Sequence, residues 1–494
     1  MEGPIAHTHY GKVKGIQANG VNIWRGIPFA APPVGPLRFQ APQPPESWDY
    51  IRETLEFGPI SHQPADTRGT RFGGTRPVHS EDCLYLNIWS PAAPKEPLPV
   101  MVWIHGGTFV TGAGSQPMFE GTEMASKGNV IVVTVNYRLG PFGFLHLSPW
   151  GAGASNQGLL DQIAALEWVR QNIAGFGGNP ELVTVFGESA GSMSIAALLA
   201  MPAAKGLFSG AIMQSGTSQT LPPQQAKRVT AALLTEMGIS PEGDLSLLLT
   251  LPAEEIMEAA DRMTRKLAGD SLSMFFQPVL DEDTLPKEPT QAVAGGAAEG
   301  IPLLIGTNRD EGNLFFREGS PPVDFEQSLK ALEALMGVEN LSGLDLDNHY
   351  SVSWEGQANL LTDLYFWRSS VSFAEGQRAH APVWMYRFDW AVPGHPLLNK
   401  AVHGAEIVFA FNNLSLLGQL GVEITPSMKR LAEAMQGAWI AFAHRRDPAT
   451  KEVPWPQYRR GERATLIFNE QPHIIQDPER EKRKRLIYNM GGSL

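Results

Sequence analysis

Short runs of β-branched and aliphatic residues recur along the middle of the chain, and each run ends in glycine or a polar turn. They are LPVMVWIHGG from residue 98, NVIVVTVNYR from 129, ELVTVFGES from 181 and GAIMQSG from 210. Runs of this length predict strands buried on both faces. Helical patterns lie between them, notably at 156–178, and this alternation predicts an α/β fold with a mainly parallel central sheet and helices on both faces.

The second half of the chain returns to strand patterns only after long helical stretches. GIPLLIGTNRDEG at 300–312 contains one predicted strand, and HAPVWMYRFDW gives another at 380–390. Amphipathic helices fill most of the sequence around 222–295 and 320–375. We expect these two insertions to lie over the C-terminal edge of the sheet and to shape access to a site there.

Composition excludes several classes of function. The apolar fraction is 43%, no apolar run approaches the ~18 residues of a membrane helix, and no secretory leader is visible. The formal net charge of −12 argues against nucleic acid and against an anionic membrane surface as partners. Cys83 is the single cysteine, so an intramolecular disulfide is impossible and a reducing, cytoplasmic location is expected.

One serine carries the strongest sign of chemistry. In VFGESAGSMS at 185–194, Ser189 stands between Gly187 and Gly191, after a strand pattern and before a helix pattern. A sharp strand-to-helix turn with small flanking residues lifts a serine hydroxyl clear of the sheet as a nucleophile. GDSLS at 269–273 resembles another hydrolase motif but follows a helix pattern, so it is set aside.

A serine nucleophile needs a base and an acid that orients the base, in the chain order serine, acid, histidine. Two histidines lie in loops after predicted strands, His395 in VPGHP and His403 before GAEIVFAF. The layout favours His403, since a glycine and an apolar run follow it, but does not exclude His395. For the acid, Asp310 and Glu311 both follow a strand, and the pattern leaves this choice open.

Two further sequence features bear on the site. The strand at 98–104 ends in His-Gly-Gly, whose backbone N–H groups, with that of Ala190, can converge on one oxyanion. His-Thr-His at 7–9 has the spacing of metal ligands, but no nearby side chain completes a site. We therefore expect neither a metal nor a cofactor.

Three longer motifs carry a family resemblance. FGESAG at 186–191, SEDCLYLNIW at 80–89 and WRGIPFAAPPVGPLRF at 24–39 resemble the type-B carboxylesterases, which include the cholinesterases, and among them the bacterial para-nitrobenzyl esterases. The resemblance implies one α/β-hydrolase domain over 1–494 and a serine, glutamate and histidine triad that cleaves carboxylic esters. It also implies that the unpaired Cys83 fits a cytoplasmic bacterial enzyme.

The resemblance assigns the triad to Ser189, Glu311 and His403. It places the oxyanion hole at Gly106, Gly107, Thr108 and Ala190. Thr108 departs from the family pattern, where glycine or alanine is usual, and its branched side chain would crowd the acyl side of the substrate.

A second group of residues is expected around the first. The resemblance implies that Glu188, Ser215 and Glu406 surround the histidine. Met193, one helical turn after Ser189, and Leu314 and Phe315, just after Glu311, are predicted to line an apolar pocket.

The sequence therefore predicts a serine carboxylesterase that hydrolyses para-nitrobenzyl, para-nitrophenyl and short-chain esters through an acyl-enzyme. The alternatives are a non-catalytic adhesion or scaffold protein on the same fold, and an amidase or thioesterase with the same triad. The expected partner is a small ester. The oligomeric state is not indicated, and a monomer is compatible with the sequence.

Overall fold

The computed structural model describes residues 3–64, 77–268, 274–320, 324–336, 341, 346 and 349–488. The chain divides into two compact units. Unit 1 comprises Met1–Val185, Met201–Ser209 and Thr220–Lys287, and unit 2 comprises Phe186–Ala200, Gly210–Gln219 and Glu288–Leu494. The prediction of a single domain with insertions stays a prediction, and the GDSLS segment lies outside the described residues.

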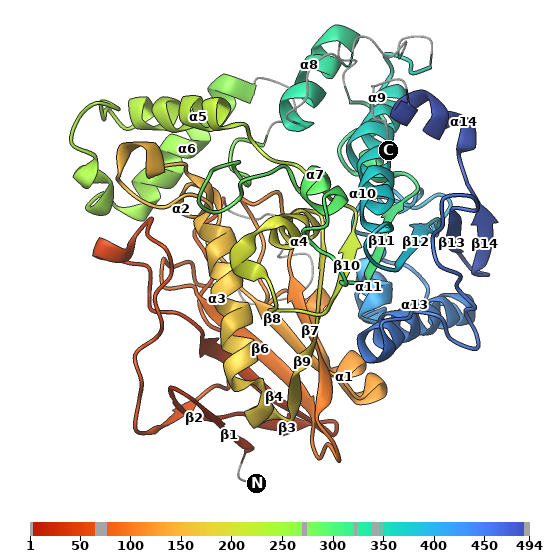
Figure 1. The fold of residues 1–494 in the computed structure, drawn as a ribbon, viewed down its shortest axis with the longest axis horizontal. Coiled ribbons are helices and arrows are strands. Elements are labelled where there is room, and N and C mark those ends of the chain that lie inside the picture. Colours follow the sequence, from red (N-terminus) through yellow and green to blue (C-terminus); the bar gives the residue numbers. More distant parts are fainter. Residues whose placement is uncertain are drawn as a thin grey trace. The chain divides into compact units, whose positions relative to one another are not determined.

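Unit 1 holds strands in the order β9-β7-β8-β6-β4-β3, and a separate three-stranded sheet in the order β1-β2-β5 (Figure 1). The strands are β1 (Ile5–Thr8), β2 (Gly11–Lys14), β3 (Ile16–Ala18), β4 (Val21–Pro28), β5 (Ile51–Glu53), β6 (Tyr85–Pro91), β7 (Leu98–Ile104), β8 (Ile131–Val135) and β9 (Gly178–Glu188), whose end from Phe186 belongs to unit 2. Strands β7 and β8 are parallel, with Val100 opposite Ile131, and both are buried throughout, as their apolar runs predict. Strands β3, β4 and β6 add antiparallel pairs.

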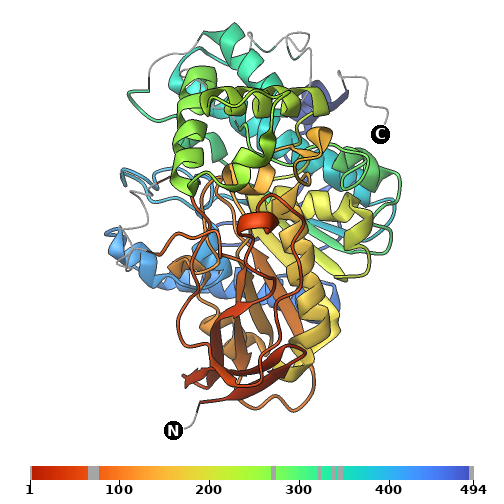
Figure 2. The same ribbon diagram turned by 90° about the vertical axis from the view of Figure 1, so that its left-hand side faces the viewer.

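The helices of unit 1 follow the amphipathic patterns of the sequence. They are α1 (Thr122–Gly128), α2 (Gly140–Phe144), α3 (Gln157–Asn172), α5 (Pro223–Glu236) and α6 (Ala253–Ala268), with 3₁₀ turns η1 (Gly35–Leu37), η3 (Pro117–Phe119), η4 (Ser148–Trp150), η5 (Ile173–Phe176), η6 (Pro202–Ala204) and η7 (Leu245–Leu249). In α6, Ile256, Ala259 and Met263 are buried at helical spacing, which gives the helix one apolar face. Figure 2 shows α5 and α6, in yellow-green, packed side by side.

A buried ion pair ties the loop after β8 to helix α3. Arg138 donates from Nε and Nη2 to the two oxygens of Asp161, at 2.8 and 2.7 Å, and the backbone N–H of Arg138 donates to the same carboxylate. Both side chains are almost fully excluded from solvent. Removing one partner of such a pair would leave an uncompensated buried charge, so the pair fixes this loop against α3.

Unit 2 holds strands in the order β14-β13-β12-β11-β10. They are β10 (Gly210–Gln214), β11 (Leu303–Asn308), β12 (Val383–Phe388), β13 (Ala464–Phe468) and β14 (His473–Gln476). Strands β10 to β13 pair in parallel, and β14 closes the edge antiparallel to β13. Because parallel strands end at the same edge, the residues that follow β10, β11 and β12 gather there.

The helices of unit 2 are α4 (Ala190–Ala200), α7 (Pro289–Ala294), α8 (Phe325–Met336), α9 (Trp354–Leu361), α10 (Ser369–Gln377), α11 (Ile407–Ala410), α12 (Ser415–Gln419), α13 (Pro426–Arg445) and α14 (Arg480–Arg483), with the 3₁₀ turn η8 (Glu311–Leu314) and the π-helices η10 (Thr362–Arg368) and η11 (Lys484–Tyr488). Every residue of α4 is buried, in keeping with its small and apolar sequence. Helices α5 to α7 fall within the first predicted insertion and α8 to α10 largely within the second.

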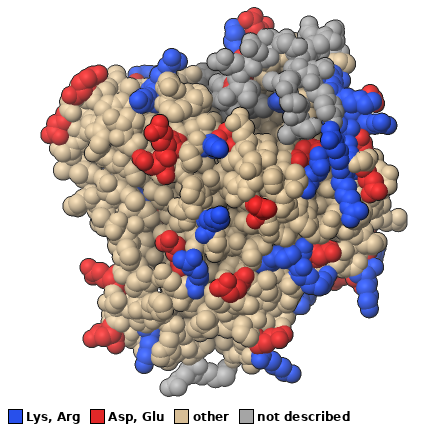
Figure 3. Space-filling model, viewed as in Figure 1, with Lys and Arg blue, Asp and Glu red and all other residues tan. Residues whose placement is uncertain are grey.

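The surface mixes acidic and basic side chains, as Figure 3 shows for one face. Within the described residues, no helix combines the length and the apolar character that a membrane crossing requires.

Candidate active site

Ser189 occupies a sharp turn between the last residue of β9, Glu188, and the first residue of α4, Ala190. Its φ of +55° lies in the left-handed region, which is strained for a residue with a side chain. Two backbone hydrogen bonds fix the turn: the Ser189 N–H donates to Gln214 O, and the Met193 N–H donates to Ser189 O, both at 2.9 Å. This strand-turn-helix geometry is typical of a nucleophile elbow.

The neighbouring turn depends on a glycine. A Cβ on Gly216 would lie 2.5 Å from Ser189 O and 3.1 Å from Met193 Cγ, so only glycine allows the segment after β10 to approach the elbow this closely. Ser215, just before it, also has a positive φ, of +55°. Two tight turns from adjacent elements therefore pack against each other at Ser189.

A short hydrogen bond joins the candidate base and acid. His403 Nδ1 donates to Glu311 Oε2 over 2.6 Å, and Glu311 Oε1 accepts the Asn308 N–H over 2.7 Å. The Glu311 carboxylate is fully buried at the start of η8, directly after β11. A buried carboxylate on Nδ1 fixes the tautomer that leaves Nε2 free to accept a proton.

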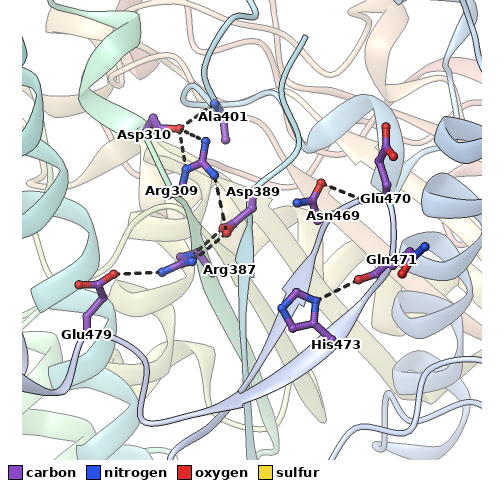
Figure 4. A network of polar contacts seen from close by, with 10 residues as sticks. All are labelled: Arg309, Asp310, Arg387, Asp389, Ala401, Asn469, Glu470, Gln471, His473 and Glu479. Carbon is purple, nitrogen blue, oxygen red and sulfur yellow. Dashed lines mark hydrogen bonds and ion pairs between the residues drawn. The ribbon is translucent and has the colours of Figure 1, made fainter. Parts of the chain in front are cut away.

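Asp310, the alternative acid, belongs to a different network, drawn in Figure 4. Its Oδ2 accepts the Ala401 N–H at 3.0 Å and pairs with Arg309 Nη2 at 3.0 Å. Arg309 Nη1 lies 3.9 Å from Asp389 Oδ2. The Asp389 carboxylate also accepts two hydrogen bonds from Arg387, from Nε and from Nη2. Of the two acids that the sequence left open, the structure brings only Glu311 to the imidazole of His403.

His395, the alternative base, has both ring nitrogens engaged in its own loop. Its Nδ1 accepts the N–H groups of Leu397 and Leu398 at 3.1 Å, and its Nε2 lies 3.1 Å from Leu420 O. An imidazole bonded in this way shapes the loop, and His403 is the histidine that contacts the buried acid.

Two more carboxylates surround His403. Glu188 Oε1 lies 3.1 Å from His403 Nε2. Glu406, fully buried, accepts from Gln214 Nε2 at 3.1 Å and from Asn308 Nδ2 at 2.6 Å. Ser215 is also buried, but its hydroxyl has no hydrogen-bond partner among the described residues.

These carboxylates change the proton affinity of the site. Burial alone would lower the pKa of His403, but Glu188, Glu311 and Glu406 outweigh burial and raise it to about 9. Burial also raises the pKa of Glu188, to about 8, although the positive imidazole opposes this shift. Since a protonated Glu188 no longer attracts the imidazolium, the two groups titrate as a coupled pair.

Sequence reasoning missed Asn308 and Gln214, which hold the acids in place. The Asn308 side chain also donates to Val402 O at 2.7 Å, so this one residue links Glu406 to the loop that carries His403. Trp439 Nε1 donates to Gln214 Oε1 at 3.0 Å and fixes the orientation of its amide. The only signal in the sequence was their place at the ends of β11 and β10.

Two aromatic rings pack against His403. The ring centroids of Phe315 and Phe366 lie 5.6 and 4.7 Å from that of the imidazole. Met193, the predicted pocket residue on α4, contacts Tyr365, whose hydroxyl lies 3.8 Å from its sulfur, and Leu314 is half-buried. The sequence analysis did not predict Phe366 and Tyr365. Both lie in the π-helix η10, and π-helical turns are frequent at functional sites.

The predicted oxyanion residues Gly106, Gly107 and Thr108 lie in unit 1, in the loop after β7, whereas Ala190 lies in unit 2. Gly107 has a φ of +113°, and Thr108 and Phe109 follow with +54° and +60°. Three successive residues with positive φ turn the backbone sharply, and Thr108 among them carries a branched side chain. The convergence of these N–H groups with that of Ala190 stays a prediction.

His105 and Cys83 lie in unit 1 and are buried. Burial lowers the pKa of His105 to about 4, and its ring stacks on Tyr137 at 4.4 Å. Burial raises the pKa of the Cys83 thiol, which suppresses its reactivity. Among the described residues, no group of three or more His, Cys, Asp or Glu side chains is arranged to hold a metal ion.

Comparisons with known proteins identify the family and the fold. The model of the carboxylesterase family matches residues 2–486. The para-nitrobenzyl esterase of Bacillus subtilis is 51% identical over 496 residues, covering 99% of this chain and 100% of that protein, and the phenmedipham hydrolase of Pseudarthrobacter oxydans is 34% identical over 481 residues, covering 95% of each.

Solved structures give the same result. A thermophilic PNB esterase superposes with a TM-score of 0.94 at 51% identity, covering 98% of this chain and 99% of that one. A Geobacillus stearothermophilus carboxylesterase gives 0.86 at 38% identity, with coverage of 98% and 99%. The predicted α/β-hydrolase fold is thereby confirmed, and no comparison supports a non-catalytic scaffold. The chain therefore belongs to the carboxylesterase family and is a serine-type carboxylic ester hydrolase.

Proposed function

We propose that Ser189 is the nucleophile of this esterase, His403 its general base and Glu311 the acid that orients the base. The observation that carries the proposal is the 2.6 Å hydrogen bond from His403 to the buried Glu311, in the same unit as the elbow serine. Nε2 of His403 takes the Ser189 proton while Oγ attacks the ester carbonyl.

The rest of the cycle follows from the same groups. Backbone N–H groups of Gly106, Gly107, Thr108 and Ala190 stabilise the oxyanion of the tetrahedral intermediate. The imidazolium protonates the departing alcohol, and a water molecule, activated by the same histidine, then releases the carboxylic acid from the acyl-enzyme.

The nucleophile and base are not yet engaged in this structure. The hydrogen bonds of the described residues include none between Ser189 Oγ and His403, and Nε2 faces Glu188 instead. Catalytic hydrogen bonds are often loose without substrate and tighten in the complex. We propose that substrate binding brings Oγ to Nε2.

The proposed substrates are para-nitrobenzyl, para-nitrophenyl and short-chain carboxylic esters. Support comes from the 51% identity to a para-nitrobenzyl esterase and from the aromatic rings beside His403. Met193, Leu314 and Phe315 are the proposed pocket residues, joined by Phe366. Apolar groups of this kind would accept an aryl or alkyl portion of an ester without leaving buried polar groups unpaired.

Matched variants test the assignment. We expect Ser189→Ala and His403→Ala to lower kcat for para-nitrophenyl acetate by ~10⁴-fold or more, and Glu311→Gln by a comparable factor. His395→Ala and Asp310→Asn, which alter the neighbouring loops but not the triad, should stay within about twofold of the parent enzyme, as substitutions that remove no transition-state contact do. Equal losses at His403 and His395, or at Glu311 and Asp310, would sink the assignment.

We further propose that the whole chain acts as one catalytic domain in the cytoplasm and that a monomer suffices for activity. The single buried Cys83 supports a reducing location, since it forms no disulfide within the chain. Activity that follows the monomer peak in gel filtration and the cytoplasmic fraction of the native cell is the expected result.

A further inference from the structure

The loop that follows β7 is held in an unfavourable backbone conformation. Gly107, Thr108 and Phe109 have φ values of +113°, +54° and +60°. A β-branched residue such as Thr108 rarely adopts the left-handed region, and such strain persists only where surrounding contacts over-determine it. The contacts that hold this loop are therefore part of what places its N–H groups.

Some of these contacts lie within the loop. The carbonyl of Gly107 accepts the N–H groups of Val110 and Thr111 at 3.1 and 2.9 Å, and Thr108 Oγ1 donates to it at 2.7 Å. The loop then folds back at Gly112, where a Cβ would lie 2.4 Å from His105 Nδ1 and 2.5 Å from Gly106 O. Gly112, near the end of the loop, therefore packs directly against His105 and Gly106 at its start.

A side chain from a distant segment clamps Gly112. Gln63 Oε1 accepts the Gly112 N–H at 2.8 Å, and Gln63 Nε2 donates to the Gly112 carbonyl at 3.0 Å. Nε2 also donates to Ser61 O at 3.2 Å, and this hydrogen bond anchors the amide to the segment that carries Gln63. All of these residues belong to unit 1.

We propose that Gln63 is a positioning residue for ester hydrolysis: its amide fixes Gly112 and so holds the N–H groups of Gly106 to Thr108 in the geometry that receives the oxyanion. The inference rests on the proposed function of this loop. A primary amide suits the task because it presents a donor and an acceptor side by side, matching the N–H and C=O of one glycine. Glutamate lacks the donor, and alanine lacks both groups.

A parallel contact on the next turn of the chain supports this reading. Asn136 Oδ1 accepts the Gly114 N–H at 2.9 Å, and Asn136 Nδ2 donates to Pro59 O at 3.2 Å. Two amides therefore tie Gly112 and Gly114 to residues 59–63. Residues 59–63 thus support the loop after β7.

The test compares Gln63→Ala and Gln63→Glu with Gln43→Ala. Gln43 is a matched control because, among the described residues, its side-chain amide makes one exposed hydrogen bond, to Ala41 O. Rates on para-nitrophenyl acetate are normalised to active sites titrated by a stoichiometric inhibitor, and binding of a trifluoromethyl ketone transition-state analogue is measured alongside. We expect Gln63→Ala to lower kcat by about tenfold or more while KM stays within about twofold of the parent value. The affinity for the trifluoromethyl ketone should fall by the same factor as kcat.

Each outcome decides the question. Should Gln63→Ala prove too unstable to purify, Gln63→Glu carries the same test, because it keeps the acceptor for the Gly112 N–H. Loss of stability with unchanged kcat per active site, or a rise in KM alone, overturns the positioning role. Ser189→Ala is assayed in parallel to separate the proposed function from the role of Gln63. If Ser189→Ala stays active, the proposed function fails. If Ser189→Ala is inactive and Gln63→Ala has normal activity, only the positioning role of Gln63 is rejected.

Discussion

Replacing Glu188 with glutamine should lower the pH at which ester hydrolysis reaches half of its maximum. Only a neutral His403 can accept the serine proton, so the acid limb of kcat/KM reports the pKa of His403 in the free enzyme. That pKa is raised above the ordinary imidazole value by the buried carboxylates around it. As the pH is lowered, the parent enzyme should therefore reach half of its maximal kcat/KM at a pH above 6.5, the ordinary imidazole pKa.

The distance between the two groups bounds the effect. Glu188 Oε1 lies 3.1 Å from His403 Nε2. Two unit charges at this separation attract by about 5 kcal/mol at an effective dielectric of ~20 and by about 1 kcal/mol in bulk water. Because one pKa unit corresponds to about 1.4 kcal/mol, these limits span roughly 1 to 4 units. Glu188 is itself partly protonated near neutral pH, so we expect a downward shift nearer the lower limit, about 1 unit.

The assay is a kcat/KM profile on para-nitrophenyl acetate from pH 5 to 10, corrected for spontaneous hydrolysis. Glu123→Gln serves as the control, since Glu123 is a half-buried helix residue whose carboxylate pairs with Lys127. Its profile should coincide with that of the parent enzyme. A parent midpoint at or below pH 6.5 would show that the carboxylates do not raise the pKa of His403. A Glu188→Gln midpoint equal to or above that of the parent would show that Glu188 does not contribute.

Two further substitutions test the strained loop and the support of the acids. Thr108→Val keeps a branched side chain at positive φ but loses the hydroxyl hydrogen bond to Gly107 O. In urea unfolding we expect it to be less stable than Thr108→Gly by about 1–2 kcal/mol. Equal stabilities of the two variants would show that this turn is not strained. Thr108→Ala should raise turnover of branched acyl esters more than that of acetate esters, and an equal gain on both would exclude Thr108 from the acyl pocket. Asn308→Ala should cost about 2 kcal/mol of stability and lower kcat, because Glu406 and Val402 O lose a buried donor; an unchanged kcat would remove Asn308 from the support of the site.

Much of this site could be predicted from local sequence. The strand-turn-helix pattern around Ser189 appears in the structure at the expected residues, because apolar runs and small flanking residues determine such a turn locally. The parallel order of β10 to β13 follows from the same alternation. No strand was predicted before residue 98, so the antiparallel strands β3, β4 and β6 are known only from the structure.

The contacts that distinguish alternatives are long-range, and the local pattern did not contain them. Asp310 and Glu311 are adjacent in sequence, yet only the direction of the backbone after β11 decides which one reaches His403. His395 and His403 likewise both lie in loops after β12. The raised pKa of His403 depends on Glu188, Glu311 and Glu406, which come from three separate segments, so sequence reasoning had only the ordinary imidazole value to offer.

Covalent labelling can show directly whether Ser189 is the nucleophile. The folded enzyme is treated with a fluorophosphonate, and the modified residue is located by peptide mass spectrometry while residual activity is followed. We expect one label per chain, on Ser189, appearing in step with the loss of esterase activity, and no label in Ser189→Ala. Inactivation with the label on another serine, such as Ser192 or Ser215, would contradict it.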